Sequence, residues 1–324
     1  MAEDHEFAPL PLNERPLVTF ALFSYNQEKY IREAVEGAFA QTYEPLEIIL
    51  SDDCSTDRTF EIMEEMAAGY KGRHVLRLNR NNENMGISTH VRFVDEIAKG
   101  EIIVHAAGDD ISIPCRTSHL VKAFRHDPDV FYVTSNAIKI THDGKTKGLL
   151  CRGADRVIRD KPTSIFKIGL PGINGCASAV RKILIASFPP PCSSIFVEDI
   201  VLLRRAYLVG SAKYIPQNLV KYRIGVGVSN KNKLSFKEAA TRLIRYKNDE
   251  LIRLKQLAED MEHIGCVGDV LTQQDLHAHI QKTILMKRVI EKTRIKDALL
   301  VVKLYGAREL LKMAKYFMKS YFNF

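Results

Sequence analysis

The chain has 324 residues, of which 46% are hydrophobic and 27% charged, a composition typical of a soluble globular protein. No apolar run reaches the about 18 residues that a membrane-spanning helix needs, and the acidic, proline-containing start is unlike a signal peptide. The six cysteines include no CxxC pair, which argues against a zinc site or a disulfide framework and favours a reducing compartment. We therefore expect a cytoplasmic protein.

The net charge of +8 is confined to the end of the chain. Residues 1–230 contain 28 Lys and Arg and 28 Asp and Glu, whereas residues 231–324 contain 19 and 11. A basic segment attracts nucleic acid or an anionic membrane, although a solvated helical face is the more common meaning. From about Leu234 onward the chain has no proline, so we expect helices. We divide the chain into an N-terminal tail (1–14), a main domain (15–230) and a basic α-helical region (231–324).

The main domain alternates strand and helix patterns. Apolar, β-branched runs predict strands, and apolar residues at helical spacing predict the segments between them. The expected strands are 16–23, 46–53, 74–79, 101–107 and 130–140, and the expected helices are 28–41, 55–69, 86–98, 115–127 and 197–210. Residues 174–182 read as a later short strand and residues 213–225 as extended chain. This alternation predicts an α/β fold with a mostly parallel sheet covered by helices on both faces.

Polar clusters follow three of these strands. "SYNQ" (24–27), "SDDCSTD" (51–57) and "GDD" (108–110) all fall at the carboxyl ends of strands, where open α/β sheets bind ligands. The adjacent acids Asp109 and Asp110 repel each other unless they share a proton or hold a cation. We therefore expect both residues to lie in a ligand site.

The usual phosphate-binding loops are missing from this sequence. It contains neither a GxGxxG after the first strand nor a GxxxxGK[ST] loop. A nucleotide could instead be held by side chains, with Tyr25 stacking on the base and Asp53 accepting from base or ribose hydroxyls. The alternative for Asp52 and Asp53 is a turn or a helix cap, where Asp is common.

Several motifs in series resemble the nucleotide-sugar-dependent glycosyltransferases of family two, which have the GT-A fold. The resemblance covers residues 15–230 and rests on "PLVTFALFSYNQEKYIREAVEGAFAQTYEPLEIILSDDCSTDRT", "NENMG", "GDDISIP", "VEDIVLLRRAYLVG" and "YRIGVGVS", which occur in the family's order. It implies an inverting, metal-dependent hexosyltransferase. The donor would be a nucleotide-diphosphate sugar, expected to be UDP-linked, and the acceptor a glycan or lipid-linked hydroxyl in bacterial cell-surface polysaccharide synthesis.

The resemblance also implies roles for individual residues. Phe23, Ser24 and Tyr25 would pack around the nucleobase and Asp53 would contact base or ribose. Asp109 and Asp110 match the motif through which Mg²⁺ or Mn²⁺ bridges the donor diphosphate. Asp199 matches the general base, with Glu198 as the fallback. Ala107 and Gly225 stand where many members have an acid and a histidine, so we expect weak metal binding without donor.

The chemistry requires these residue types. A carboxylate can take the proton of the attacking acceptor hydroxyl, and a hard divalent cation can offset the charge on the departing diphosphate. For "VED" the alternative is an acidic first turn that suits the helix dipole. Two other functions were weighed: a non-catalytic sugar-nucleotide scaffold, and a nucleic-acid-binding protein using the basic tail. The presence of both the candidate base and the candidate metal ligands argues against a scaffold. The absence of a recognised nucleic-acid-binding motif in the sequence argues against nucleic-acid binding.

The last residues form a predicted amphipathic helix, 303–321. Its basic residues are Arg308, Lys312, Lys315 and Lys319, and its apolar residues are Leu310, Met313, Ala314, Phe317 and Tyr321. Two interpretations stay open. The helix packs on its own chain or forms a homo-oligomer contact, or it lies on the cytosolic membrane face and brings the enzyme to a lipid-linked acceptor.

Overall fold

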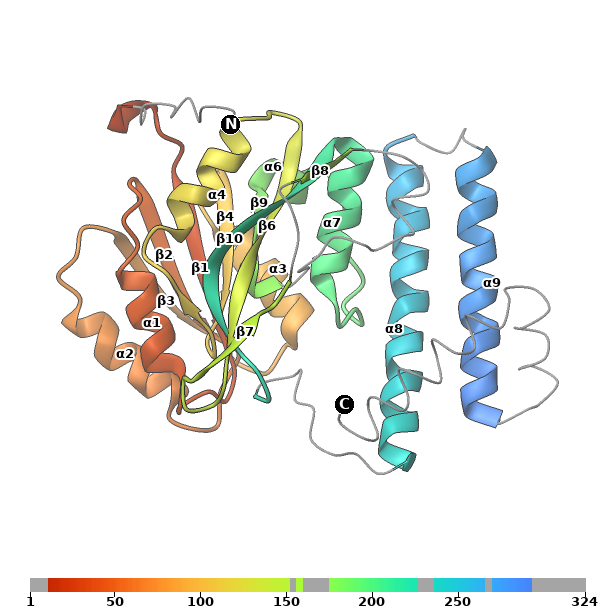
Figure 1. Cartoon of the computed structure of the whole chain (residues 1–324), viewed down its shortest axis with the longest axis horizontal. Helices are drawn as coiled ribbons and strands as arrows, with labels where there is room; N and C mark the ends of the chain where they lie inside the picture. The colour runs from red at the N-terminus through yellow and green to blue at the C-terminus, as the bar shows by residue number, and fades with distance from the viewer. Residues whose placement is uncertain (1–10, 152–155, 160–174, 227–235, 266–269, 293–324) are drawn as a thin grey trace.

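The computed structural model describes residues 11–151, 156–159, 175–226, 236–265 and 270–292. Helices flank one large sheet, and two long helices stand beside it (Figure 1). The strands are β1 (Val18–Ser24), β2 (Leu46–Asp52), β3 (Val75–Arg80), β4 (Ile102–Ala107), β5 (Ile111–Ser112), β6 (Val130–Ile140), β7 (Thr146–Leu149), β8 (Arg156–Arg159), β9 (Ser178–Arg181) and β10 (Ser211–Arg223). The α-helices are α1 (Ile31–Phe39), α2 (Thr59–Gly69), α3 (Ile87–Ile97), α4 (Arg116–Arg125), α6 (Lys182–Ala186), α7 (Glu198–Val209), α8 (Phe236–His263) and α9 (Val270–Lys292). Short 3₁₀ turns occupy Leu12–Glu14 and Gly175–Ala177.

The sheet has the order β3-β2-β1-β4-β9-β6-β10-β5, with β7 on β6 and β8 on β10. The first four strands in this order are parallel, as the strand–helix alternation predicts. Strand β9 then inserts antiparallel between β4 and β6, and β10 runs parallel to β6. Each predicted helix and strand of the main domain is present. The short elements β5, β7, β8 and α6 were not predicted, because two to five residues carry little periodic signal.

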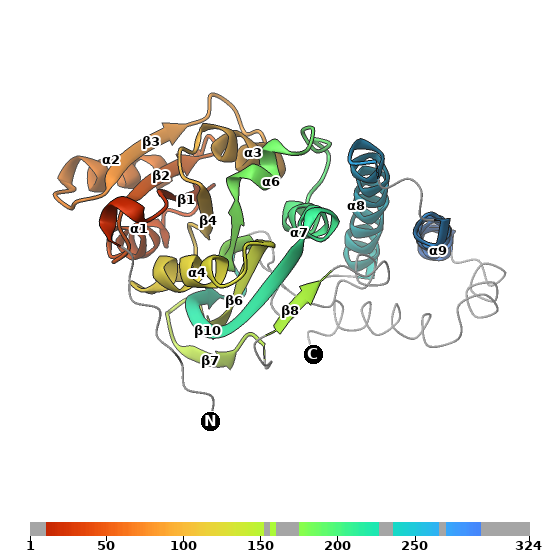
Figure 2. The same cartoon turned by 90° about the horizontal axis from the view of Figure 1, so that it is seen from above.

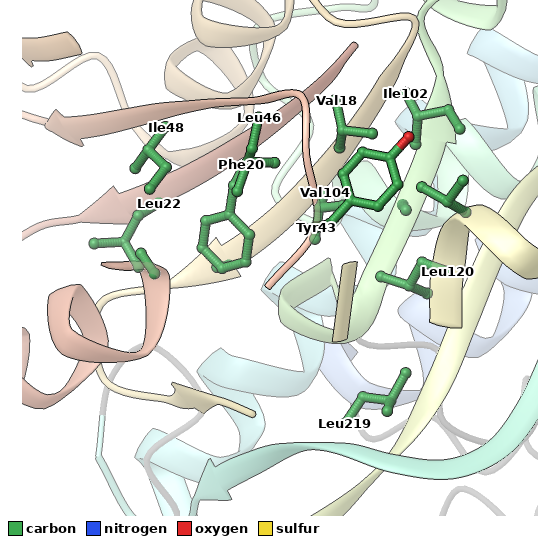
Figure 3. Packing of buried hydrophobic residues seen from close by; sticks show 14 of the residues in the cluster. Val18, Phe20, Leu22, Tyr43, Leu46, Ile48, Ile102, Val104, Leu120 and Leu219 are labelled. Atoms are coloured by element: carbon green, nitrogen blue, oxygen red, sulfur yellow. The ribbon is translucent and has the colours of Figure 1, made fainter. Parts of the chain in front are cut away.

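Successive side chains of β1 supply the two faces of the sheet. Val18, Phe20 and Leu22 are buried against α1, α2 and α4, and Figure 3 shows them beside Leu46 and Ile48 of β2. Ala21 and Phe23 belong to the opposite core, under α3, α6 and α7. The period of two along a strand explains this division. Because both faces are covered, the parallel strands read as nearly continuous apolar runs.

The predicted helical C-terminal region is present as α8 and α9. Figure 2 shows α8 beside α7 and α9 beyond α8, on the same side of the sheet. Leu254 and Leu257 of α8 are buried in the same core as Leu203 of α7, so this helix shares the core of the main domain. A separate domain from residue 231 stays a prediction. The amphipathic segment 303–321 lies outside the described residues, and none of the described helices has the length and apolar character needed to cross a bilayer.

Candidate active site

The carboxyl ends of β1, β2 and β4 meet at one edge of the sheet and border a cavity of about 830 Å³. The parallel register aligns Phe23 with Ser51 and with Ala107, so the three following loops begin side by side. All eight predicted site residues line this cavity: Phe23, Ser24, Tyr25, Asp53, Asp109, Asp110, Glu198 and Asp199. They come from four separate segments of the chain.

Asp53 is buried, and its carboxylate is already engaged. Oδ1 accepts hydrogen bonds from Asn81 Nδ2 (2.7 Å) and from the N–H of Met85 (2.9 Å), and Oδ2 accepts from the N–H of Gly86 (3.0 Å). The residue therefore fixes the "NENMG" loop against the cavity. A direct contact of Asp53 with a nucleotide stays a prediction. Tyr25 has the opposite character, since it is 44% exposed and free to stack on a planar ligand.

Asp109 and Asp110 form an acidic pair just after β4, in which Asp110 is buried and Asp109 half-buried. Burial, followed by the neighbouring Asp109 charge, raises the pKa of Asp110 to about 7, and burial likewise raises the pKa of Asp109. Arg223 holds the pair from the far end of β10. Its backbone N–H donates to Asp110 Oδ1 (2.8 Å) and its Nε donates to the Asp109 carbonyl (3.0 Å). These contacts fix the Asp110 carboxylate and the backbone of Asp109.

The oxygens at this turn suit a hard cation. Gln27 Oε1 is buried without a hydrogen-bond partner, and the Gln27 side chain contacts Asp109, so a spare oxygen acceptor lies beside the acidic pair. Mg²⁺ and Mn²⁺ prefer such oxygen ligands. No group of three or more His, Cys, Asp or Glu side chains among the described residues could hold a metal alone. The residues fit a cation that takes its remaining ligands from a substrate and water.

Asp199 and Glu198 begin α7 at the cavity wall. Oδ2 of Asp199 accepts a hydrogen bond from the N–H of Gly175 (3.1 Å), whereas its Oδ1 is buried without a partner. Burial, followed by the Asp199 charge, raises the pKa of Glu198 to about 8. Burial also raises the pKa of Asp199, but hydrogen bonds from Ile200 and Gly175 and the positive charge of Arg253 oppose this rise. At neutral pH Glu198 therefore keeps its proton more readily, and Asp199 has the free acceptor atom.

Two histidines line the cavity, and neither was predicted from the sequence as a site residue. The rings of His90 and His105 contact Phe23 edge-on, with centroids 5.4 Å and 5.7 Å from its ring. His90 Nε2 lies 2.6 Å from Ser51 Oγ, and burial lowers the pKa of His90. His105 Nε2 lies 2.8 Å from Asp95 Oδ1 on α3. Both rings are thus fixed by partners behind the cavity wall and help to hold Phe23 in place.

Other functional candidates were also missed. Gly175 and Cys176 reach the cavity only because the 3₁₀ turn precedes the inserted strand β9, and Arg245 reaches it from α8. Arg223 belongs to "YRIG", a motif that marked the resemblance but did not reveal a role for the arginine. No local pattern could have located Arg245, since an arginine in a long helix is ordinary.

The profile described as "Glycosyl transferase family 2" matches residues 19–186, which contain the first three polar loops of the site. The chain belongs to this family. An uncharacterized protein of Mycobacterium tuberculosis is 41% identical over 110 residues, covering 33% of this chain and 31% of that protein. The Escherichia coli protein named UDP-Glc:alpha-D-GlcNAc-diphosphoundecaprenol beta-1,3-glucosyltransferase WfaP is 32% identical over 120 residues, covering 37% and 45%. The chain therefore matches less than half of the length of these family 2 relatives.

Two solved structures share the fold of this family 2 chain. The mannosyltransferase PcManGT from Pyrobaculum calidifontis, in complex with GDP-Man and Mn²⁺, has a TM-score of 0.55 and 16% identity, covering 97% of this chain and 88% of its own. S. aureus TarS 1-349, in complex with UDP, has a TM-score of 0.51 and 18% identity, covering 94% and 80%. The expected GT-A fold, with a helical C-terminal region, is confirmed.

Proposed function

We propose that this family 2 protein is an inverting glycosyltransferase that moves a sugar from a nucleotide-diphosphate sugar, UDP-linked, to an acceptor hydroxyl. One observation carries the proposal. One cavity is lined by the exposed ring of Tyr25, by the acidic pair Asp109 and Asp110, and by Asp199, whose Oδ1 has no hydrogen-bond partner among the described residues. These are the groups that base stacking, diphosphate neutralisation and proton removal require.

The donor would occupy the edge between β1 and β4. Phe23, Ser24 and Tyr25 border the nucleobase in this proposal, with Asp53 holding the loop around it. Asp109, Asp110 and the Gln27 amide oxygen would hold Mg²⁺ or Mn²⁺ against the diphosphate. When bound, the cation supplies Lewis-acid stabilisation of the leaving group. The TarS structure is a complex with UDP and the PcManGT structure a complex with GDP-Man and Mn²⁺, which supports a nucleotide-sugar donor and a divalent metal.

Asp199 is proposed as the general base and Glu198 as its neutral neighbour. The acceptor hydroxyl transfers its proton to Oδ1 of Asp199 while its oxygen forms a bond to the anomeric carbon. The bond from that carbon to the diphosphate oxygen breaks, and the nucleoside diphosphate leaves with the electron pair. The Gly175 N–H keeps the carboxylate oriented through Oδ2. A single displacement of this kind inverts the anomeric centre.

The acceptor is proposed to be a glycan or lipid-linked sugar in cell-surface polysaccharide synthesis. The E. coli relative WfaP, named as a glucosyltransferase for a GlcNAc-diphosphoundecaprenol acceptor, supports this class. The basic composition of residues 231–324 supports a peripheral position on the cytosolic membrane face.

A thermal-shift screen tests the proposal. UDP- and GDP-linked sugars are each added with Mn²⁺ or with EDTA, and the true donor raises the melting temperature only with the metal, because only a bound ligand stabilises by mass action. Donor hydrolysis is then measured with the best ligand. A protein that binds donors but never turns them over is a scaffold, and one that binds none contradicts the proposal.

A further inference from the structure

A second, smaller cavity of about 260 Å³ adjoins the main one. The two share Gly86 and Ile87 at the start of α3, Phe196 from the loop before α7, and Arg245 from α8. The smaller cavity is also lined by hydroxyl and amide groups, from Ser88, Ser193, Ser194 and Asn248. Its apolar lining residues are Ile87, Ile195 and Ile252.

The N-terminus of α3 borders this cavity; the Gly86 N–H donates to Asp53 Oδ2 (3.0 Å), and no described side chain caps the N–H groups that follow it. Gly86 stands at the N-cap position, with no side chain to accept from the first turn, and the first turn contains no acidic residue. The helix is 11 residues long, so its first N–H groups and its dipole favour an anion at this end.

A buried hydroxyl at the same place lacks a partner. Ser88 is 5% exposed and lines the smaller cavity, and its Oγ makes no hydrogen bond within the part of the chain that the structure describes. A buried hydroxyl without a partner costs free energy, so native structures seldom leave one unsatisfied. Rotation about χ1 of Ser88 would turn this hydroxyl toward a ligand oxygen in the cavity.

Arg245 brings a positive charge to the junction of the two cavities. Its guanidinium carbon lies 4.5 Å from the centroid of the Phe196 ring. Two other cations of α8 are paired, Lys247 with Glu250 (2.6 Å) and Arg253 with Asp249 (2.6 Å), but Arg245 makes no ion pair with the described residues. Stacking on an aromatic face leaves the edge of the guanidinium free to donate to a phosphate.

Among the described residues that line the smaller cavity, the one acid, Asp249, is already engaged. Oδ1 of Asp249 accepts from the N–H of Phe196 (2.6 Å), and Oδ2 accepts from Arg253 Nε (2.6 Å). The cavity therefore offers donors and positive charge to a ligand: backbone N–H groups, hydroxyls and a guanidinium. Phe196, at its border, is three residues before the candidate base Asp199.

We propose that the smaller cavity binds a phosphate group of the acceptor substrate, held by the α3 N-terminus, Ser88 and Arg245. This inference rests on the proposed function and names its acceptor class, a phosphate-linked sugar. The donor diphosphate has its own site at Asp109 and Asp110, whereas this cavity borders the loop that leads to the base. A base acts on the acceptor, so a second anion site beside it fits an acceptor phosphate. The isoleucine lining suits an apolar group esterified to that phosphate.

Isothermal titration calorimetry with geranyl diphosphate in EDTA tests the site without metal binding at Asp109 and Asp110. We expect Arg245→Gln to weaken binding by about tenfold or more, since it removes a charge-assisted contact. Ser88→Ala should weaken binding about threefold. Lys255→Gln is the matched control, because it makes the same charge change on an exposed part of α8, and it should leave binding near wild type.

UDP titrated in Mn²⁺ separates the two substrates. Arg245→Gln and Ser88→Ala should bind UDP as the wild type does. Equal geranyl diphosphate affinity in the wild type and all three variants overturns the acceptor site. A loss of UDP binding in Arg245→Gln also overturns it, because Arg245 would then bind the donor. Wild-type protein that binds geranyl diphosphate but never UDP contradicts the proposed function alone.

Discussion

Oδ1 of Asp249, on α8, accepts a hydrogen bond of 2.6 Å from the backbone N–H of Phe196. This contact joins the C-terminal helical region to the loop that leads into the candidate base. Gln256, two turns further along α8, accepts from the N–H of Cys192 (2.9 Å) in the same loop. Arg205 of α7 pairs with Asp260 through two hydrogen bonds of 2.9 Å. Helix α8 thus holds one wall of the site.

Asp249→Ala should destabilise the fold by about 3–5 kcal/mol, because it leaves the buried Arg253 guanidinium without its carboxylate. Urea unfolding followed by circular dichroism measures the change. Glu259→Ala, at an exposed position on the same helix, serves as the control and should cost less than about 1 kcal/mol. Similar losses in the two variants would show that the contacts of Asp249 with Arg253 and Phe196 contribute little to stability.

Asp109→Asn and Asp110→Asn should each abolish the gain in UDP affinity that Mn²⁺ brings, because a neutral amide is a poor ligand for a hard cation. The fold should survive, since Asn at position 110 keeps an oxygen for the N–H of Arg223. Calorimetry of UDP in Mn²⁺ and in EDTA measures the difference, with exposed Asp275→Asn on α9 as the control. Wild-type protein that binds UDP equally in both buffers would mean that the acidic pair shares a proton instead.

Asp199→Asn should lower sugar transfer by roughly 10²-fold or more while UDP affinity stays near wild type, because the base acts on the acceptor proton and not on the donor. Asn keeps an oxygen that can accept from the Gly175 N–H, so the loop should not move. Initial rates under donor saturation, together with UDP calorimetry, separate the two effects. If Glu198→Gln gives the larger loss of rate, the base is Glu198.

Glu198 should make the fold less stable as pH rises. Its folded-state pKa of about 8 lies above the usual value of 4.5, so the folded protein binds this proton more tightly than the unfolded chain. The stabilisation is complete below about pH 4.5 and is lost as pH rises through about 8. The negative charges of Asp199, Asp95 and Asp249 oppose ionisation.

Urea unfolding of wild type and Glu198→Gln at pH 5 to 9 tests this linkage. The wild type should lose stability relative to the variant across the range, because the amide has no proton to lose. Asp110, whose pKa is raised to about 7, titrates in both proteins and cancels in the comparison. Parallel curves would show that Glu198 is ionised in the fold at neutral pH.

The basic residues of segment 303–321 should bind the chain to anionic vesicles if this segment is a peripheral helix. Each basic residue near such a surface adds about 1 kcal/mol, and salt screens the effect. Replacing Arg308, Lys312, Lys315 and Lys319 by Gln should abolish co-sedimentation with phosphatidylglycerol vesicles, and high salt should release the wild type. Equal sedimentation of both proteins would leave the segment as a packing or oligomer contact.

Local sequence patterns were enough to predict the longer strands and helices of residues 16–140. Continuous apolar, β-branched runs predict the strands, and apolar residues at helical spacing predict the helices between them. Polar side chains just after strands then fall at one edge of a parallel sheet. Phe23, Asp53 and Asp109 could be grouped for this reason before any tertiary contact was known. Asp199 was found through the resemblance, since an acid in a first helical turn has an ordinary structural explanation.

Tertiary structure alone decided what each side chain contacts. Arg223 meets Asp110 across 113 residues of sequence, and Phe196 meets Asp249 across 53. The tertiary structure also shows that both carboxylate oxygens of Asp53 accept hydrogen bonds from the chain at and just before the "NENMG" loop. It places Ser88 and Arg245 around one cavity. Periodicity reports which face of an element is buried, but not which distant element covers it. That choice depends on packing the whole chain at once, so residues that act through long-range contacts carry no local signal.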